Sequence, residues 1–266
     1  MTPFRLALCA GIALMLTAPA TPTLAQSKAK PAAAAKPAAK PAADEVEPAA
    51  VQALTRMSAY LGTLTTFDIT ASTSVDLVLT DGQKVKLDGV NHYTVRRPDG
   101  FVVEVATAAK TRRLMYDGKT LTLVSPELGY YASVEAPGTI RETMDAAADP
   151  YGLHIPLQDL FRWTDPAMQN RSAFQGALVV GPGKVDGHDA TQYAFREAEV
   201  DWQLWIQDGD KPVPLKVVII DRKDLAHPQY EATLTWNPTT QVTKDSFTYR
   251  PDQGAMPIRL TSLKPE

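Results

Sequence analysis

The chain has 266 residues, a length that fits one or two domains. It carries 27 lysines and arginines against 30 aspartates and glutamates, and the resulting formal net charge of −3 argues against nucleic-acid binding. Hydrophobic residues make up 44% of the chain and charged residues 21%, which is typical of a globular protein with a core. The single cysteine, Cys9, lies close to the N-terminus, so a mature protein that loses this end has no disulfide and no cysteine site.

Residues 1–25 have the pattern of a secretory signal peptide. Arg5 supplies the positive charge, residues 6–16 form the apolar stretch, and cleavage is expected between Ala25 and Gln26. An uncleaved anchor is the alternative, but the apolar stretch is shorter than the ~20 residues that a membrane-spanning helix needs. We therefore expect a periplasmic protein with no stable transmembrane segment after processing.

Residues 26–48 form an Ala-, Pro- and Lys-rich segment that we interpret as a flexible linker, because frequent proline prevents a continuous helix and alanine buries little apolar surface. Its four lysines either contact an anionic lipid or cell-wall polymer or belong to a solvated spacer, and we favour the spacer. Residues 49–266 then form the globular domain.

This domain opens with a predicted helix. Pro48 suits a first helical turn, and apolar residues follow at intervals of three or four: Ala50, Leu54, Met57, Leu61 and Leu64. The apolar side of this N-terminal helix is expected to cover a sheet.

Residues 67–79 alternate strictly between apolar and polar positions, which predicts one long strand that must curl. After the turn signal Asp81-Gly82, the same alternation continues over residues 85–95. A two-residue turn would place apolar side chains on opposite faces, so the loop must have an odd number of residues or contain a bulge. The pairs expected on this basis are Leu79 with Val85, Leu77 with Leu87, and Val75 with Gly89.

Further strands are predicted from alternation and turn signals. They cover residues 101–107, 111–116, 120–125, 129–135, 176–181, 190–197, 201–208, 214–222, 229–236 and 245–250. Two helices, at 138–148 and 156–163, separate the two groups of strands. The expected fold is mainly β (α+β): a large curled antiparallel sheet that forms an open half-barrel, covered by the N-terminal helix and a central helical lid.

No motif supports catalysis or a cofactor. The four histidines lack the spacing of a metal site, and the chain has no Gly-x-Ser-x-Gly motif. Gly181-Pro182-Gly183-Lys184 differs from a phosphate-binding loop in its glycine spacing and reads as a turn. We therefore expect no enzyme activity, no metal and no cofactor. The alternative is an enzyme whose site is assembled only by folding, which would need a convergent cluster of titratable groups in a cleft.

Large, adaptable apolar side chains are the remaining candidates for a binding site, because aromatic residues and methionine often line apolar pockets. The residues expected to line such a pocket are Met115, Met144, Leu157, Phe161, Trp163 and Trp202. The alternative for each of them is an ordinary place in the core.

Several segments together resemble a known family. Residues 93–104, with Arg97-Pro98 between two strands, and the later Asp117-Gly118-Lys119 are similar to the opening of periplasmic lipoprotein carriers of the LolA/LolB type. Residues 201–206 and 212–216 resemble the same superfamily. The signal, linker and domain together resemble a set of predicted periplasmic proteins. These proteins are classed as a domain of unknown function within the same superfamily.

This resemblance implies an apolar concave face under a helical lid that holds acyl chains or senses lipoproteins. We expect a non-enzymatic carrier, chaperone or sensor for an acyl chain, lipid or lipoprotein. The alternative is an interaction module with a self-filled core that binds an envelope protein and no small ligand.

Overall fold

The structure is a computed structural model that describes residues 45–107, 110–151, 157 and 174–260. The chain divides into two units, Met1–Lys40 and Pro41–Glu266, and the fold belongs to the second unit. Its main elements, in chain order, are α1 (Pro48–Thr63), β1 (Thr66–Val78), β2 (Lys84–Arg96), β3 (Gly100–Thr107), β4 (Thr111–Tyr116), β5 (Thr120–Ser125), β6 (Tyr130–Glu135), α2 (Ile140–Tyr151), β7 (Gly176–Val185), β8 (His188–Arg196), β9 (Val200–Gln207), β10 (Pro214–Asp221), β11 (Gln229–Asn237) and β12 (Met256–Pro257).

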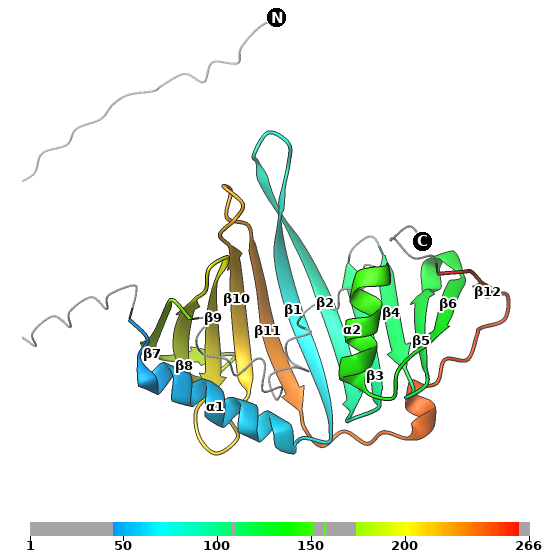
Figure 1. Ribbon diagram of the computed structural model, residues 1–266, viewed down its shortest axis with the longest axis horizontal. Helices are drawn as coiled ribbons and strands as arrows, with labels where there is room; N and C mark the ends of the chain where they lie inside the picture. The colour runs from blue at the N-terminus through cyan, green and yellow to red at the C-terminus, as the bar shows by residue number, and fades with distance from the viewer. Residues whose placement is uncertain (1–44, 108–109, 152–156, 158–173, 261–266) are drawn as a thin grey trace, which may run out of the picture. The chain divides into compact units, whose positions relative to one another are not determined.

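The strands of the described residues form one sheet, in the order β12-β6-β5-β4-β3-β2-β1-β11-β10-β9-β8-β7 (Figure 1). Neighbouring strands are antiparallel except for the short pair β12 and β6. Strands β7 and β12 form the two edges, so the sheet is open. The mainly β fold with a large open antiparallel sheet and helices is confirmed.

The open sheet is uncurled, so the prediction of a curled sheet that forms a half-barrel is wrong. The pairing of β11 with β1 ends at Val75, and the pairing of β3 with β2 ends at Gly89. Residues 76–88 lie beyond both of these pairings, and their only pairing is across the β1–β2 hairpin, where Leu87 and Asp88 lie opposite Val75 and Ser74. The excess length of the two strands is therefore taken up by a hairpin that projects beyond the sheet (Figure 1).

The register of this hairpin agrees with the expected parity but not with the expected pairs. Leu77 lies opposite Val85, and Val75 lies opposite Leu87. Five residues, 79–83, connect the strands, which confirms an odd-numbered loop. The pairs differ from the expected ones by two residues, because alternation fixes which face a side chain occupies but not where the turn closes.

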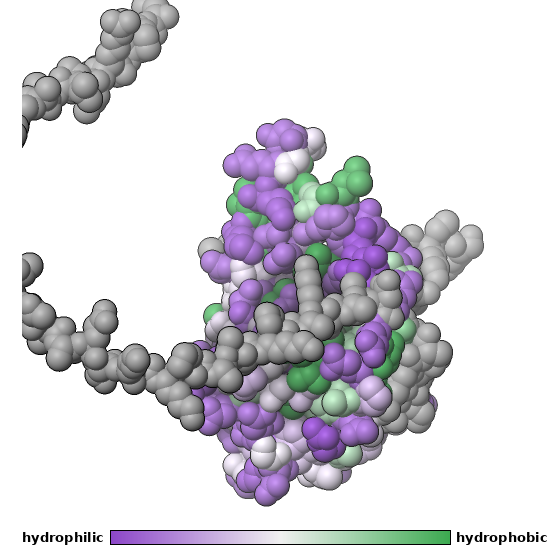
Figure 2. Space-filling view, turned by 90° about the vertical axis from the view of Figure 1, so that its left-hand side faces the viewer, coloured by the Kyte–Doolittle hydropathy of each residue, from purple (hydrophilic) through white to green (hydrophobic). Residues whose placement is uncertain are grey.

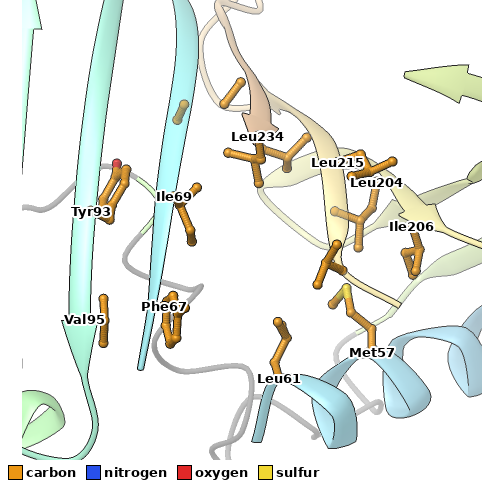
Figure 3. Packing of buried hydrophobic residues seen from close by; sticks show 14 of the residues in the cluster. Met57, Leu61, Phe67, Ile69, Tyr93, Val95, Leu204, Ile206, Leu215 and Leu234 are labelled. Atoms are coloured by element: carbon orange, nitrogen blue, oxygen red, sulfur yellow. The ribbon is translucent and has the colours of Figure 1, made fainter. Parts of the chain in front are cut away.

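Helix α1 begins at Pro48, in the first turn, where a missing N–H costs nothing. Met57 and Leu61 are buried on its inner side. Figure 3 shows both side chains pointing toward sheet residues such as Leu204 and Leu215. The predicted role of this helix as a cover for part of the sheet is confirmed.

Helix α2 lies in front of β3 and β4 (Figure 1). The Glu142 amide donates to the Thr139 hydroxyl, which caps the first turn, and that hydroxyl donates to the Glu142 carboxylate at 2.7 Å. Ile140, Met144 and Ala147 are buried in the same hydrophobic core as α1. The helix agrees with the one predicted at 138–148, with its end a few residues later.

Most of the predicted strands are confirmed, and those at 111–116 and 120–125 agree with the structure at both ends. The strand predicted at 245–250 is wrong, because Lys244–Phe247 form a 3-10 turn that begins with a capping box at Thr243. The helix predicted at 156–163 lies outside the described residues except for Leu157, as do the signal peptide, the Ala25–Gln26 cleavage site and most of the linker. Among the described residues, no helix is both long and apolar enough to span a membrane.

Candidate functional site

The sheet has one apolar face, and both helices cover it. Because alternate residues of a strand point to opposite faces, the register can be followed from strand to strand. One row runs across five strands: Trp236, Ile69, Tyr93, Val103 and Leu114. All but Trp236 are buried, and Trp236 packs against the core with its ring 5.6 Å from that of Phe67. This apolar face is the main hydrophobic surface of the unit.

The apolar face continues beyond the helices onto the β1–β2 hairpin. We call residues 75–88 the projecting hairpin. Its large aliphatic side chains on that face remain strongly exposed: Val75 40%, Leu77 47%, Leu79 38%, Val85 37% and Leu87 47%. Figure 2 shows hydrophobic surface on this projection at the top of the molecule, among hydrophilic residues. A contiguous apolar strip that is open to water is typical of a surface that binds a partner or ligand.

The other face of the projecting hairpin is polar and internally satisfied. Asp76 accepts a hydrogen bond from Lys86 at 3.1 Å, lies 3.5 Å from Lys84 and accepts one from the Gln229 amide at 3.2 Å. The hydrogen bond from Lys86 is the main reason why the pKa of the Asp76 carboxyl is lowered from its usual value. The two faces therefore differ: charges pair with one another on one face, while aliphatic groups lack cover on the other.

Three polar side chains lie on the apolar face near the base of the projecting hairpin. Asn91 is 2% exposed and donates to the Tyr93 hydroxyl at 3.3 Å. Tyr230 lies opposite Val75, and its hydroxyl oxygen is buried without a hydrogen-bond partner among the described residues. Burial raises the pKa of both tyrosines, because the phenolate would be poorly solvated there. An apolar surface with a few polar groups of fixed position is typical of ligand sites.

The predicted lining residues do not all come together. Met144 is buried on α2, and Leu157 packs against the same core with a positive φ of 56°. Trp202 is half-buried on the apolar face, stacked on Phe195 with ring centroids 4.1 Å apart. Met115 lies on the opposite face, in a polar cleft. Phe161 and Trp163 lie outside the described residues.

The exposed aliphatic residues of the projecting hairpin and Tyr230 were not among the predicted site residues. The alternation of residues 67–79 predicted an apolar face as far as Leu79. We expected the helices to cover this face along its whole length. The signal that could have found the exposed strip is the length of the two strands, which exceeds that of every neighbouring predicted strand.

The chain is therefore a mainly β protein in which two helices pack against one face of an open antiparallel sheet. The chain belongs to the family described as predicted periplasmic protein (DUF2092), whose profile matches residues 50–261. This match confirms the expected family and the expected periplasmic localisation. No match was found among curated proteins.

Solved structures with a similar arrangement include LprF from Mycobacterium bovis, which is 15% identical, with 75% of this chain and 98% of that chain covered and a TM-score of 0.45. A LolA superfamily protein from Nitrosomonas europaea is 10% identical, with 75% and 97% covered and a TM-score of 0.35. MucB, in the complex MucA/MucB from Pseudomonas aeruginosa, is 16% identical, with 76% and 61% covered and a TM-score of 0.36.

Proposed function

We propose that the protein is a non-enzymatic periplasmic binding protein for an acyl chain, as part of a lipid or a lipoprotein. The observation that carries the proposal is the strip of five exposed aliphatic side chains on the projecting hairpin, which continues the apolar face of the sheet. An acyl chain that lies along this strip would remove aliphatic surface from water at about 0.8 kcal/mol per buried CH₂.

The geometry supports a ligand with a polar group as well as an apolar tail. The buried hydroxyl of Tyr230 has no hydrogen-bond partner among the described residues, and it lies at the base of the strip. An unpartnered buried hydroxyl is costly, so a carbonyl or phosphate oxygen of a ligand would stabilise this position. Helices α1 and α2 then act as a lid over the apolar face on either side of the β1–β2 pair.

The contribution of the strip to the binding free energy follows from the exposed fraction of its side chains. Leu77 and Leu87 each keep 47% of their surface exposed, and complete burial of a leucine is worth about 1.5–3 kcal/mol. Covering the remaining half of each side chain is therefore worth about 1 kcal/mol. Replacing both by serine should cost about 2 kcal/mol of binding free energy, or roughly a 30-fold increase in Kd.

The test combines native mass spectrometry with ligand titration. The mature protein is purified from periplasm without detergent, weighed, and extracted with organic solvent, and a fluorescent fatty acid is then titrated. We expect a stoichiometric lipid adduct, and a roughly 30-fold loss of probe affinity in Leu77→Ser/Leu87→Ser. Tyr230→Phe should weaken binding without changing the apolar surface.

Leu128→Ser is the matched control, because Leu128 is 61% exposed and follows β5, which β3 and β4 separate from the β1–β2 hairpin. It should bind like the wild type. A clean apo mass together with no binding of the fluorescent fatty acid would contradict the proposal. That result would favour an interaction module for an envelope protein.

A further inference from the structure

The polar face of the sheet carries a cleft of about 520 Å³ between strands β1 to β4 and the chain segment that follows β11. From the sheet it is lined by Asp68, His92, Thr94, Val102, Glu104, Arg113 and Met115, and from the later segment by Thr240, Gln241, Val242 and Ser246. This volume lies within the range of small-molecule sites. The cleft is on the opposite side of the sheet from the acyl-chain site, so it needs a separate explanation.

Strand register places the charged groups of the cleft in one line. His92 lies directly opposite Glu104, and Glu104 lies directly opposite Arg113. Asp68 occupies the adjacent row, opposite Thr94. With about 4.8 Å between strands, these groups span three strand spacings, or roughly 15 Å. Residues from four strands therefore face one cleft.

The charges of the cleft do not cancel. Arg113 donates from Nε at 3.0 Å and from Nη2 at 2.6 Å to the same Glu104 oxygen, so these two side chains neutralise one another. Asp68 has no such partner: its Oδ2 accepts a hydrogen bond from the Thr240 hydroxyl. Among the described residues, its Oδ1 is buried and accepts none. Among the described residues, the Asp68 carboxyl group is therefore the acidic group of the cleft without a cationic partner, and one of its oxygens accepts no hydrogen bond.

A buried carboxylate oxygen without a donor is unfavourable, and a charged donor compensates it best. A protonated amine supplies both the hydrogen bond and the positive charge. A magnesium or calcium ion needs six or more oxygen ligands, whereas only one carboxylate of the cleft is unpaired. Within the described ranges, no three His, Cys, Asp or Glu side chains are placed to hold a metal ion.

The remaining lining groups suit the polar body of such a ligand. The Nδ1 atom of His92 lies 3.2 Å from the Thr70 hydroxyl, which leaves Nε2 for a further hydrogen bond. Hydroxyl and amide groups come from Thr94, Gln241 and Ser246. We infer that this cleft is a second binding site, for a small polar molecule whose protonated amine pairs with the free oxygen of Asp68.

The experiment titrates the full mature chain with 1,5-diaminopentane by calorimetry and follows the His92 ring by NMR. Magnesium chloride and the doubly N-acetylated, neutral form of the diamine are titrated separately. We expect saturable binding of the diamine, a shift of the His92 signals, and at least a tenfold weaker binding of the neutral form.

Two variants and a control test the role of Asp68. Asp68→Asn keeps the shape and removes the charge, and it should weaken diamine binding at least tenfold. Val102→Phe fills the cleft between Thr94 and Met115 and should abolish binding without touching the carboxylate. Asp210→Asn removes a charge from an exposed turn and should leave binding unchanged. Thermal unfolding verifies that each variant is folded.

The inference is overturned by any of three results: no diamine binding at millimolar concentration, equal binding of the neutral form, or wild-type affinity in both cleft variants. Saturable magnesium binding that is tighter than diamine binding and lost in Asp68→Asn would also overturn it, because the site would then be a metal site. Fatty-acid binding should be the same in Asp68→Asn and the wild type. The failure of this inference can therefore be distinguished from the failure of the proposed acyl-chain site.

Discussion

The contact between Phe247 and Gly100 attaches the segment after β11 to the sheet, and it allows a quantitative test. Phe247 is 1% exposed, and the Arg96 guanidinium lies 4.7 Å from its ring centroid. Replacing a buried phenylalanine by alanine costs about 3–5 kcal/mol, and loss of the cation–π contact adds about 0.5–1 kcal/mol. Phe247→Ala should therefore lower the free energy of unfolding by about 4 kcal/mol.

The second half of the test uses Gly100. A Cβ atom at Gly100 would lie 3.1 Å from two Phe247 ring atoms and 3.2 Å from Nη2 of Arg96, closer than the ~3.5 Å of a comfortable contact. Gly100→Ala should cost about 1–2 kcal/mol in the wild type, because the ring must move. In the Phe247→Ala background the ring is gone, and the same change should be neutral or slightly stabilising, since alanine restricts the unfolded chain.

Urea unfolding of the wild type, the two single variants and the double variant, followed by circular dichroism, gives the coupling energy between the two positions. We expect a coupling of about 1–2 kcal/mol that makes the double variant more stable than the sum of the single effects. An equal cost of Gly100→Ala in both backgrounds, within about 0.5 kcal/mol, would refute the packing argument.

Two further predictions concern stability. Leu61→Ala should cost about 2–5 kcal/mol in urea unfolding, because Leu61 is 1% exposed between α1 and the sheet, and a loss of less than 1 kcal/mol would contradict the docking of α1. Arg196 donates two hydrogen bonds of 2.8 Å to Asp201 and so holds the pKa of that carboxyl below its usual range. Its ionised form therefore contributes stability that is present above the pKa of the unfolded chain and lost as the pH falls through the lowered folded pKa. The stability difference between wild type and Asp201→Asn should shrink on acidification below about pH 4, and a constant difference would contradict this assignment.

Local patterns predicted the strands well, because period-two alternation and turn residues are properties of short segments. They failed where two local signals compete. Residues 245–250 alternate like a strand, but the Thr243–Ser246 capping box stabilises a 3-10 turn, and burial of Phe247 against β3 holds it. Strand β12 has two residues and offers no periodicity at all.

The face of Met115 could not be predicted from its strand, because Leu114, Met115 and Tyr116 are three large apolar residues in succession. Pairing sends Leu114 to the apolar face, opposite Leu123, and Met115 to the other face, opposite Thr122. Met115 is nevertheless only 9% exposed, and it shares a cleft with residues of the segment after β11. A long-range contact of that kind leaves no trace in the strand itself.

The polar cleft could not be predicted from the sequence for a related reason. Asp68, His92, Glu104 and Arg113 are ordinary polar residues of predicted strands, and nothing in their spacing along the chain distinguishes them. Only the register of three successive strand pairs brings them to one place. Sequence motifs of catalysis or metal binding depend on short spacing along the chain. A site assembled from several strands therefore matches no such motif.

The two proposed sites follow from one structural property of the sheet. Because neighbouring residues of a strand point to opposite faces, β1 places Ile69 on the apolar face and Asp68 in the polar cleft. A substitution at an odd position of β1 therefore changes the apolar face, whereas a substitution of Asp68, the β1 residue that lines the cleft, changes the polar face. Such neighbouring substitutions in one strand can separate the two binding activities while the backbone hydrogen bonds of the strand remain the same.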